Sequence, residues 1–172
     1  MNHKELLPLI KNALTEHNIE GRYFCFEITE TTAIADIDMA CDTIQNIKNL
    51  GCKVALDDFG TGMSSYSYLR DLPIDYLKID GSFVKNIANN EVDYAFVKSI
   101  TDIAAAMHIQ TVAEWVEDKE TLSCLKEIGV TFGQGDAISK PISSERLLDQ
   151  ALHKTQLSDA CADVKIEQTS SA

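Results

Sequence analysis

The fold is decided by the stretch Val54-Ala55-Leu56-Asp57-Asp58-Phe59-Gly60-Thr61-Gly62. Its three apolar residues are typical of a strand, which ends in two adjacent carboxylates and a turn with two glycines. Neighbouring carboxylates repel each other unless a positive group lies beside them, and ligands of α/β proteins bind at the carboxyl ends of strands. Two interpretations follow: a divalent-metal site, or a pair of aspartates that caps a helix.

The composition indicates one acidic globular domain. The chain has 172 residues, of which 45% are apolar, and this is enough for a single sizeable core. Its formal net charge of −12 disfavours a protein that binds a nucleic acid polymer through Lys and Arg. An anionic nucleotide would need cations to neutralise such an acidic site, which favours Mg²⁺ or Mn²⁺.

Cysteine usage and hydropathy indicate the cellular compartment. The five cysteines are scattered, without a Cys-x-x-Cys pair, as expected for reduced thiols and not for a disulfide framework or a zinc site. No apolar run approaches the ~20 residues of a membrane span, and the N-terminus lacks a signal-peptide pattern. We therefore expect a cytoplasmic protein without a membrane span.

Helix-like and strand-like segments alternate along the chain. The apolar spacing predicts helices near residues 4–17, 37–47, 92–107, 122–128 and 147–152, and strands near 23–26, 53–56, 74–79, 111–113 and 130–132. Strands that alternate with helices predict an α/β fold with a parallel sheet and external helices. The polar segment 156–172 is predicted to be a disordered tail.

Each predicted strand delivers a polar residue near its carboxyl end. These residues are Glu27, the Asp57-Asp58 pair, Lys78, Glu114 and Gln134. Because the carboxyl ends of parallel strands meet at one face of a barrel, the five positions predict a shared active site.

The motifs around these positions resemble the EAL-domain family of cyclic di-GMP phosphodiesterases. The resemblance is carried by Phe26-Glu27-Ile28-Thr29-Glu30, Asp57 to Gly62, Leu72-Pro73-Ile74-Asp75, Leu77-Lys78-Ile79-Asp80, Ala113-Glu114 with Val116-Glu117, Gln134-Gly135 and Lys140-Pro141. It extends from about Lys4 to Leu152, with the order and spacing of the motifs preserved.

The resemblance implies a modified TIM barrel with two divalent cations, Mg²⁺ or Mn²⁺. By this resemblance, four acids ligate or surround the metals: Glu27, Asp57, Asp58 and Glu114. Lys78 and Glu114 match catalytic positions, and Gln134 matches a residue of the water and substrate network. Glu30 matches a glutamate that braces the loop after the double Asp. The family couples that loop to dimerisation.

Other roles stay open for the same residues. Glu27 and Glu114 could be surface acids, Lys78 could form a structural ion pair with Asp57 or Asp80, and Gln134 is uninformative by itself.

Parts of the family pattern have no counterpart in this sequence. Five strands match the last five of the family's eight, whereas the Glu-Ala-Leu tripeptide with its metal-binding glutamate is missing, as is an asparagine metal ligand. The sequence therefore predicts a truncated EAL domain at residues 1–155, folded as a partial TIM-like barrel. Trp115 occupies a position where the family usually has glycine, and Asp136 replaces a usual aromatic residue; both changes are expected to weaken nucleotide binding.

Two functions compete. The first is an EAL-type phosphodiesterase that hydrolyses cyclic di-GMP to linear pGpG and is weak or inactive in this truncated form. The alternative is a non-catalytic cyclic di-GMP-binding or protein-interaction module of bacterial second-messenger signalling. Since five strands cannot close a barrel built for about eight, we also expect a second copy or a complementing chain to cover the open edges.

Overall fold

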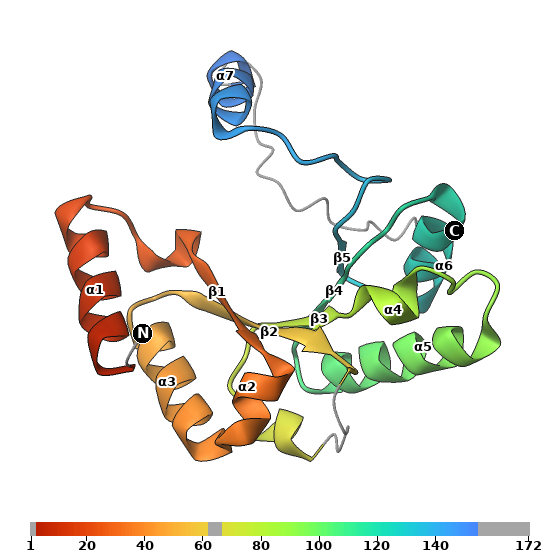
Figure 1. Ribbon diagram of the computed structural model, residues 1–172, viewed down its shortest axis with the longest axis horizontal. Coiled ribbons are helices and arrows are strands. Elements are labelled where there is room, and N and C mark those ends of the chain that lie inside the picture. The colour runs from red at the N-terminus through yellow and green to blue at the C-terminus, as the bar shows by residue number, and fades with distance from the viewer. Residues whose placement is uncertain (1–2, 62–66, 155–172) are drawn as a thin grey trace.

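The structure, a computed structural model, describes residues 3–61 and 67–154 and has the predicted α/β architecture (Figure 1). Its helices are α1 (His3–Glu16), α2 (Glu30–Ala35), α3 (Ile37–Asn49), α4 (Gly81–Val84), α5 (Glu91–Ala106), α6 (Lys119–Ile128) and α7 (Ser144–Lys154), with short 3-10 helices at Gly21–Tyr23 and Tyr68–Arg70. The strands are β1 (Cys25–Thr29), β2 (Lys53–Phe59), β3 (Tyr76–Ile79), β4 (Gln110–Ala113) and β5 (Phe132–Gly133).

The strands form one parallel sheet in the order β1-β2-β3-β4-β5. Consecutive strands are neighbours in the sheet. Helix α2 contacts β1 and β2, α3 contacts β2, and α5 contacts β4. In Figure 1 the helices α2, α3 and α5 lie below the sheet, and no described element covers the opposite face. The predicted parallel sheet with external helices is confirmed.

The hydrophobic core lies between the sheet and these helices. Successive residues of a strand point to opposite faces, and the residues Val54, Leu56, Leu77 and Ile79 that face the helices are fully buried. Burying each of these side chains stabilises the fold by roughly 1.5–3 kcal/mol. The outer face of the sheet therefore holds the structure together, and the inner face is left for polar side chains.

The inner face of the sheet is hollowed. A depression of about 260 Å³ is lined by Glu27, Lys53, Ala55, Tyr76, Lys78 and Val112 from the strands, together with residues 22–25 and Gln134, which follows β5. Four strands contribute to this lining, which brings Glu27, Lys78 and Gln134 of the predicted site onto a common surface.

Side chains cap the main helices. Asp36, Asn90 and Asp118 each accept a hydrogen bond from a backbone N–H in the first turn of α3, α5 and α6. Gly129 ends α6 in the left-handed conformation, with a φ of 94°, which a glycine adopts without steric cost. Asp80 caps α4 through the Ser82 N–H.

Several strand boundaries differ from the prediction; β3, for example, begins at Tyr76 instead of residue 74. The first strand begins at Cys25, because Gly21–Tyr23 turns tightly against the end of α3; a Cβ on Gly21 would lie 2.2 Å from the Leu50 carbonyl oxygen. Strand β2 continues through both aspartates to Phe59. The last strand is Phe132–Gly133, shorter than expected.

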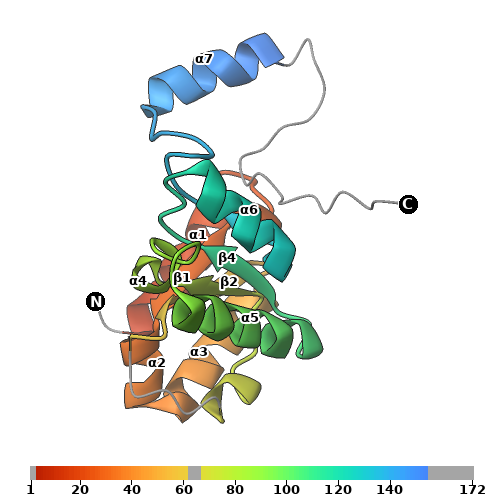
Figure 2. The same ribbon diagram turned by 90° about the vertical axis from the view of Figure 1, so that its right-hand side faces the viewer.

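The C-terminal part leaves the body of the molecule. In Figures 1 and 2 helix α7 stands apart from the sheet, and its Leu147 and Leu148 side chains are exposed. Gly62 of the predicted site loop and the predicted disordered tail 156–172 lie outside the described residues. Within the described part of the chain, no helix is long and apolar enough to cross a bilayer.

Asp75 joins the amino-terminal ends of three strands. Its backbone N–H donates to the Val54 carbonyl oxygen and its own carbonyl oxygen accepts from Gln110. Its carboxylate accepts from the Val54 N–H at 3.0 Å and lies 3.2 Å from Lys48 and 2.9 Å from Lys53. Burial favours the neutral acid, but Lys53, the Val54 N–H and Lys48 outweigh it and hold the pKa of Asp75 below its ordinary value.

We expect Asp75→Asn to lower the free energy of unfolding at pH 7 by about 1–2 kcal/mol, because both ion pairs are lost. Since the pKa is lower in the folded state, this contribution exists above the unfolded-state value of about 3.9 and disappears as the pH falls through the folded-state pKa. Urea denaturation of both proteins between pH 7 and pH 3 measures the difference. Asp102→Asn, in an exposed pair with Lys98, is the control and should change stability by less than about 0.5 kcal/mol.

Candidate active site

Asp57 and Asp58 point to the same side of the sheet although they are neighbours in a strand. Regular alternation would send one of them into the core. The pairing of β2 with β3 shifts register between Leu56 and Phe59, and Asp58 has a φ of 57°. This β-bulge turns Asp58 toward the inner face, while Phe59 returns to the core with no exposed surface.

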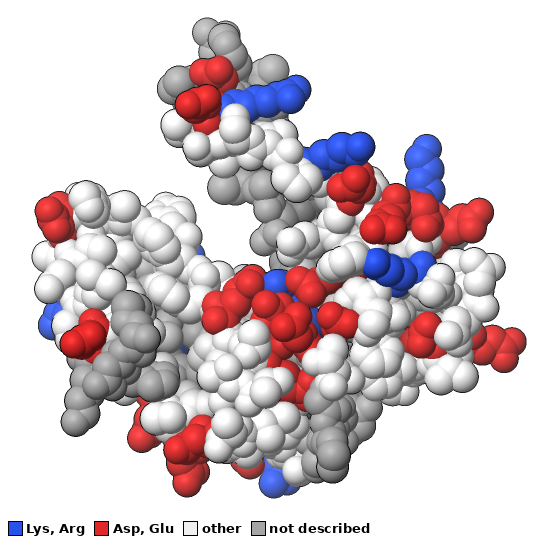
Figure 3. All heavy atoms as spheres, in the orientation of Figure 1, with Lys and Arg blue, Asp and Glu red and all other residues white. Residues whose placement is uncertain are grey.

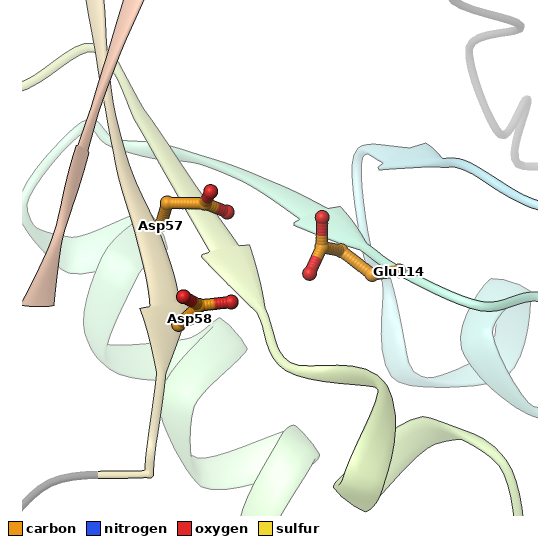
Figure 4. A group of neighbouring side chains, drawn as sticks. All are labelled: Asp57, Asp58 and Glu114. Atoms are coloured by element: carbon orange, nitrogen blue, oxygen red, sulfur yellow. The ribbon is translucent and has the colours of Figure 1, made fainter.

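Glu114 completes a group of three carboxylates. It follows β4, and its backbone N–H donates to the Ile79 carbonyl oxygen at 3.2 Å. One carboxylate oxygen from each of Asp57, Asp58 and Glu114 lies within 4.8 Å of the other two. Figure 4 shows the two aspartates on β2 and the glutamate beyond the end of β4, facing one another across β3. Acidic side chains also gather at the centre of the face seen in Figure 3.

Lys78 lies beside this group and joins three strands. Its ammonium is 2.8 Å from Asp57 Oδ1, 2.8 Å from Glu114 Oε1 and 3.1 Å from Glu27 Oε2, and its side chain is 9% exposed. Burial works against the charged ammonium, but the bonds to the three carboxylates outweigh it and raise the pKa of Lys78 above its ordinary value. Lys78 therefore carries a fixed positive charge. Of the two structural partners considered from the sequence, Lys78 pairs with Asp57, and no ion pair with Asp80 is found among the described residues.

The three carboxylates fit a divalent cation. The pKa of Glu114 is raised above its ordinary value, because burial and the nearby charges of Asp57 and Asp58 outweigh the opposing effect of Lys78. Asp57 Oδ1 is buried and close to the Lys78 ammonium but has no hydrogen bond of good geometry. An all-oxygen set with unsatisfied negative charge suits Mg²⁺ or Mn²⁺.

The other predicted site residues lie around this centre. Glu27 lies within β1, is half-exposed, and contacts Lys78 without joining the group of three. Gln134 follows β5, where its backbone N–H donates to Ala113 and its carbonyl oxygen accepts from Val116. Its side chain is exposed at the rim of the hollow that Lys78 also lines.

Glu30 is fully buried on the outer side of this centre. Its Oε2 accepts from the Gly60 backbone N–H at 3.0 Å, and its Oε1 accepts from the Tyr68 hydroxyl. Gly60 follows the double aspartate directly, so the Glu30 carboxylate attaches this segment to the start of α2. Tyr68 is not among the predicted site residues, because a tyrosine in a polar loop carries no sequence signal of such a contact.

Parallel strands that alternate with helices and direct polar side chains to one face define the class of TIM-barrel-like α/β proteins. The sequence profile of the EAL domain matches residues 1–141. The chain belongs to the EAL domain family.

Two relatives are named for the same activity. The chain is 52% identical over 124 residues to the cyclic di-GMP phosphodiesterase PdeB of Shewanella oneidensis, covering 72% of this chain and 14% of PdeB. It is 40% identical over 132 residues to the cyclic di-GMP phosphodiesterase PdeF of Escherichia coli, covering 77% of this chain and 18% of PdeF. The chain thus spans less than a fifth of the length of these relatives.

Solved EAL structures have the same fold. The PaMucR phosphodiesterase in complex with c-di-GMP superposes with a TM-score of 0.78 at 34% identity, over 83% of this chain and 57% of that chain. The EAL domain of Mycobacterium smegmatis DcpA superposes with a TM-score of 0.80 at 35% identity, over 86% of this chain and 66% of that chain. These structures support the interpretation of the five-stranded sheet as part of a barrel.

We expect Lys78→Met to lower the free energy of unfolding without metal by about 3 kcal/mol, because three carboxylates then face one another without a counter-charge. Mn²⁺ should restore part of the loss, since it replaces the missing positive charge and binds only the folded state. Thermal denaturation with and without Mn²⁺ measures both effects. Lys98→Met is the exposed control; equal metal-free stability of Lys78→Met and wild type would contradict the prediction.

Proposed function

We propose that this chain is a cyclic di-GMP phosphodiesterase domain that hydrolyses its substrate to linear pGpG. The observation that carries the proposal is the meeting of Asp57, Asp58 and Glu114 beside Lys78 at the carboxyl ends of the strands. The phosphodiesterase names of the two relatives support the same activity.

Each residue has a role in this proposal. Asp57, Asp58, Glu114 and, from β1, Glu27 hold Mg²⁺ or Mn²⁺, which supplies charge neutralisation and a water made nucleophilic near neutral pH. Lys78 stays protonated, orients the attacking water and offsets the negative charge that develops on the phosphate. Gln134 contacts water and substrate at the rim of the hollow. Glu30 holds the segment after the double aspartate in place.

We further propose that the 172 residues on their own turn over slowly. Two-metal hydrolysis requires ligands for both ions at a defined separation, and the described acids form one group of three with Glu27 engaged by Lys78. We also propose that residues 1–155 form the domain, that a polar tail follows it, and that the protein is cytoplasmic. No disulfide joins the four described cysteines.

The experiment combines binding and turnover. Purified protein is incubated with cyclic di-GMP and Mn²⁺, the products are separated by chromatography, and binding is measured by calorimetry with and without the metal. We expect metal-dependent binding, with slow formation of linear pGpG. Asp57→Asn should weaken Mn²⁺ binding at least tenfold, because it removes a charged ligand from the group.

The outcomes separate the two functions. Formation of pGpG that depends on Mn²⁺ and Asp57 supports the phosphodiesterase. Metal-dependent binding without any product would assign the chain to the non-catalytic binding modules instead. Absence of binding in both conditions would contradict the phosphodiesterase and the cyclic di-GMP-binding module, and would favour the protein-interaction module.

We also propose that another chain, a second copy or a complementing chain, covers the inner face of the sheet. Among the described strands β1 is at the edge of the sheet, and its burial alternates between exposed and half-buried residues. Tyr23 and Phe24, directly before β1, are 71% and 40% exposed. Unpaired strand edges beside exposed aromatic side chains favour association.

We expect the 172-residue protein to sediment as a dimer at micromolar concentration. Phe24→Lys should shift it toward the monomer, because a charge would replace an apolar contact beside the β1 edge. Val92→Lys, at another exposed apolar residue, is the matched control. A stably folded wild-type monomer at every concentration tested would remove the second-copy version of the proposal.

A further inference from the structure

The two segments that carry the metal-site carboxylates are not neighbours in the sheet. Asp57 and Asp58 belong to β2 and Glu114 follows β4, with β3 between them. The distance between the aspartates and the glutamate therefore depends on what fills the space beyond the end of β3. Helix α4 occupies this position, because it begins two residues after Ile79.

Helix α4 packs against the segment that follows the aspartates. A Cβ on Gly60 would lie 2.7 Å from the Phe83 ring and 3.0 Å from the Phe96 ring. These two rings stack with their centroids 4.1 Å apart. In addition, the Asp80 N–H donates to the Phe59 carbonyl oxygen at 3.3 Å. This side of α4 is thus attached to the end of β2.

Trp115 packs against the other side of α4. Its indole lies on Gly81, where an added Cβ would be 2.5 Å from Trp115 Cγ and 2.7 Å from Cδ1. The Lys85 ammonium lies 3.6 Å from the centroid of the indole, within the range of a cation–π interaction. Although the residue is 52% exposed, its ring is therefore held by contacts at both ends of α4.

The backbone of Trp115 is constrained as well. Its φ of 55° is unusual for a bulky residue and is maintained only where the surroundings demand it. Glu114 N–H is bonded to Ile79 on one side, and Val116 N–H is bonded to Gln134 on the other at 3.0 Å. The turn that carries Glu114 is thus attached to β3 and to the end of β5, and the indole attaches it to α4.

We propose that Trp115 is a positioning residue that sets the place of Glu114 opposite Asp57 and Asp58. By packing on Gly81 and Lys85, the indole fixes the Glu114 turn to α4, and α4 in turn abuts the segment after the aspartates. Trp115 itself touches neither metal nor substrate in this scheme. The expected effect of Trp115 on cation affinity rests on the proposed metal site. The positioning of Glu114 by Trp115 does not require a metal.

The first experiment measures Mn²⁺ affinity of the full 172-residue chain by calorimetry. We expect Trp115→Ala to weaken Mn²⁺ binding by about tenfold, as for other residues that orient metal ligands, and Trp115→Phe to have a smaller effect because a ring still covers Gly81. Ile128→Ala, in the core at the far end of α6, is the control for general loss of stability. If Trp115→Ala binds Mn²⁺ as tightly as wild type, the proposal is overturned.

The second experiment tests the contact itself. Gly81→Ala should weaken Mn²⁺ binding in the wild-type background, because the new methyl group displaces the indole. In the Trp115→Ala background the same change should have a smaller further effect, because the contacts with Cγ and Cδ1 are removed and only the Cβ atom, 2.9 Å from the new methyl group, remains. Additive effects of the two substitutions would contradict the proposed contact.

The third experiment needs no metal and separates this inference from the proposed function. Trp115→Ala should speed hydrogen exchange at the Glu114 and Val116 amides of the metal-free protein, whereas Ile128→Ala should not do so selectively. If the wild-type protein binds no Mn²⁺ but Trp115→Ala still speeds exchange at these two amides, the proposed metal site is wrong and the positioning role of Trp115 is supported. Unchanged exchange in Trp115→Ala would refute the positioning role.

Discussion

The Lys78 ammonium is the interaction on which the centre of this molecule depends. It meets carboxylates from β1, β2 and the segment after β4, all within 3.1 Å. Without it, the three negative side chains would repel one another. Burial works against the ammonium, but the three carboxylates raise the pKa of Lys78 above its ordinary value. Lys78 therefore stays charged and allows an acidic cluster to persist in the folded chain. The same charge balance leaves net negative potential next to it, where a divalent cation fits.

Two local irregularities shape this site. The bulge at Asp58 places two neighbouring aspartates on one face, and the left-handed backbone of Trp115 turns the chain directly after Glu114. Both conformations cost free energy for residues other than glycine. They are maintained by contacts around them: Glu30 holds the Gly60 segment, and α4 supports both turns through Gly60 and Gly81. Strain at these two residues thus coincides with the carboxylates that define the centre.

The fold and the proposed chemistry place different demands on the two faces of the sheet. The outer face carries apolar residues such as Val54 and Leu77 that helices cover, and it supplies the stability of the domain. The inner face carries charged and aromatic residues around an open hollow. A closed barrel would shelter such a surface. Solved EAL structures superpose on this chain over 57% and 66% of their own length.

The sequence by itself determined the fold class and predicted which polar residues lie near the ends of the strands. Apolar periodicity and polar strand ends are local properties, so they can be recognised without coordinates. Only the tertiary structure decided that Asp57 and Asp58 lie within β2 on one face, that Lys78 pairs with three acids at once, and that Trp115 rests on Gly81. A bulge and a three-way ion pair depend on contacts between residues far apart in the chain. No local pattern encodes which of several charged neighbours a buried lysine will meet.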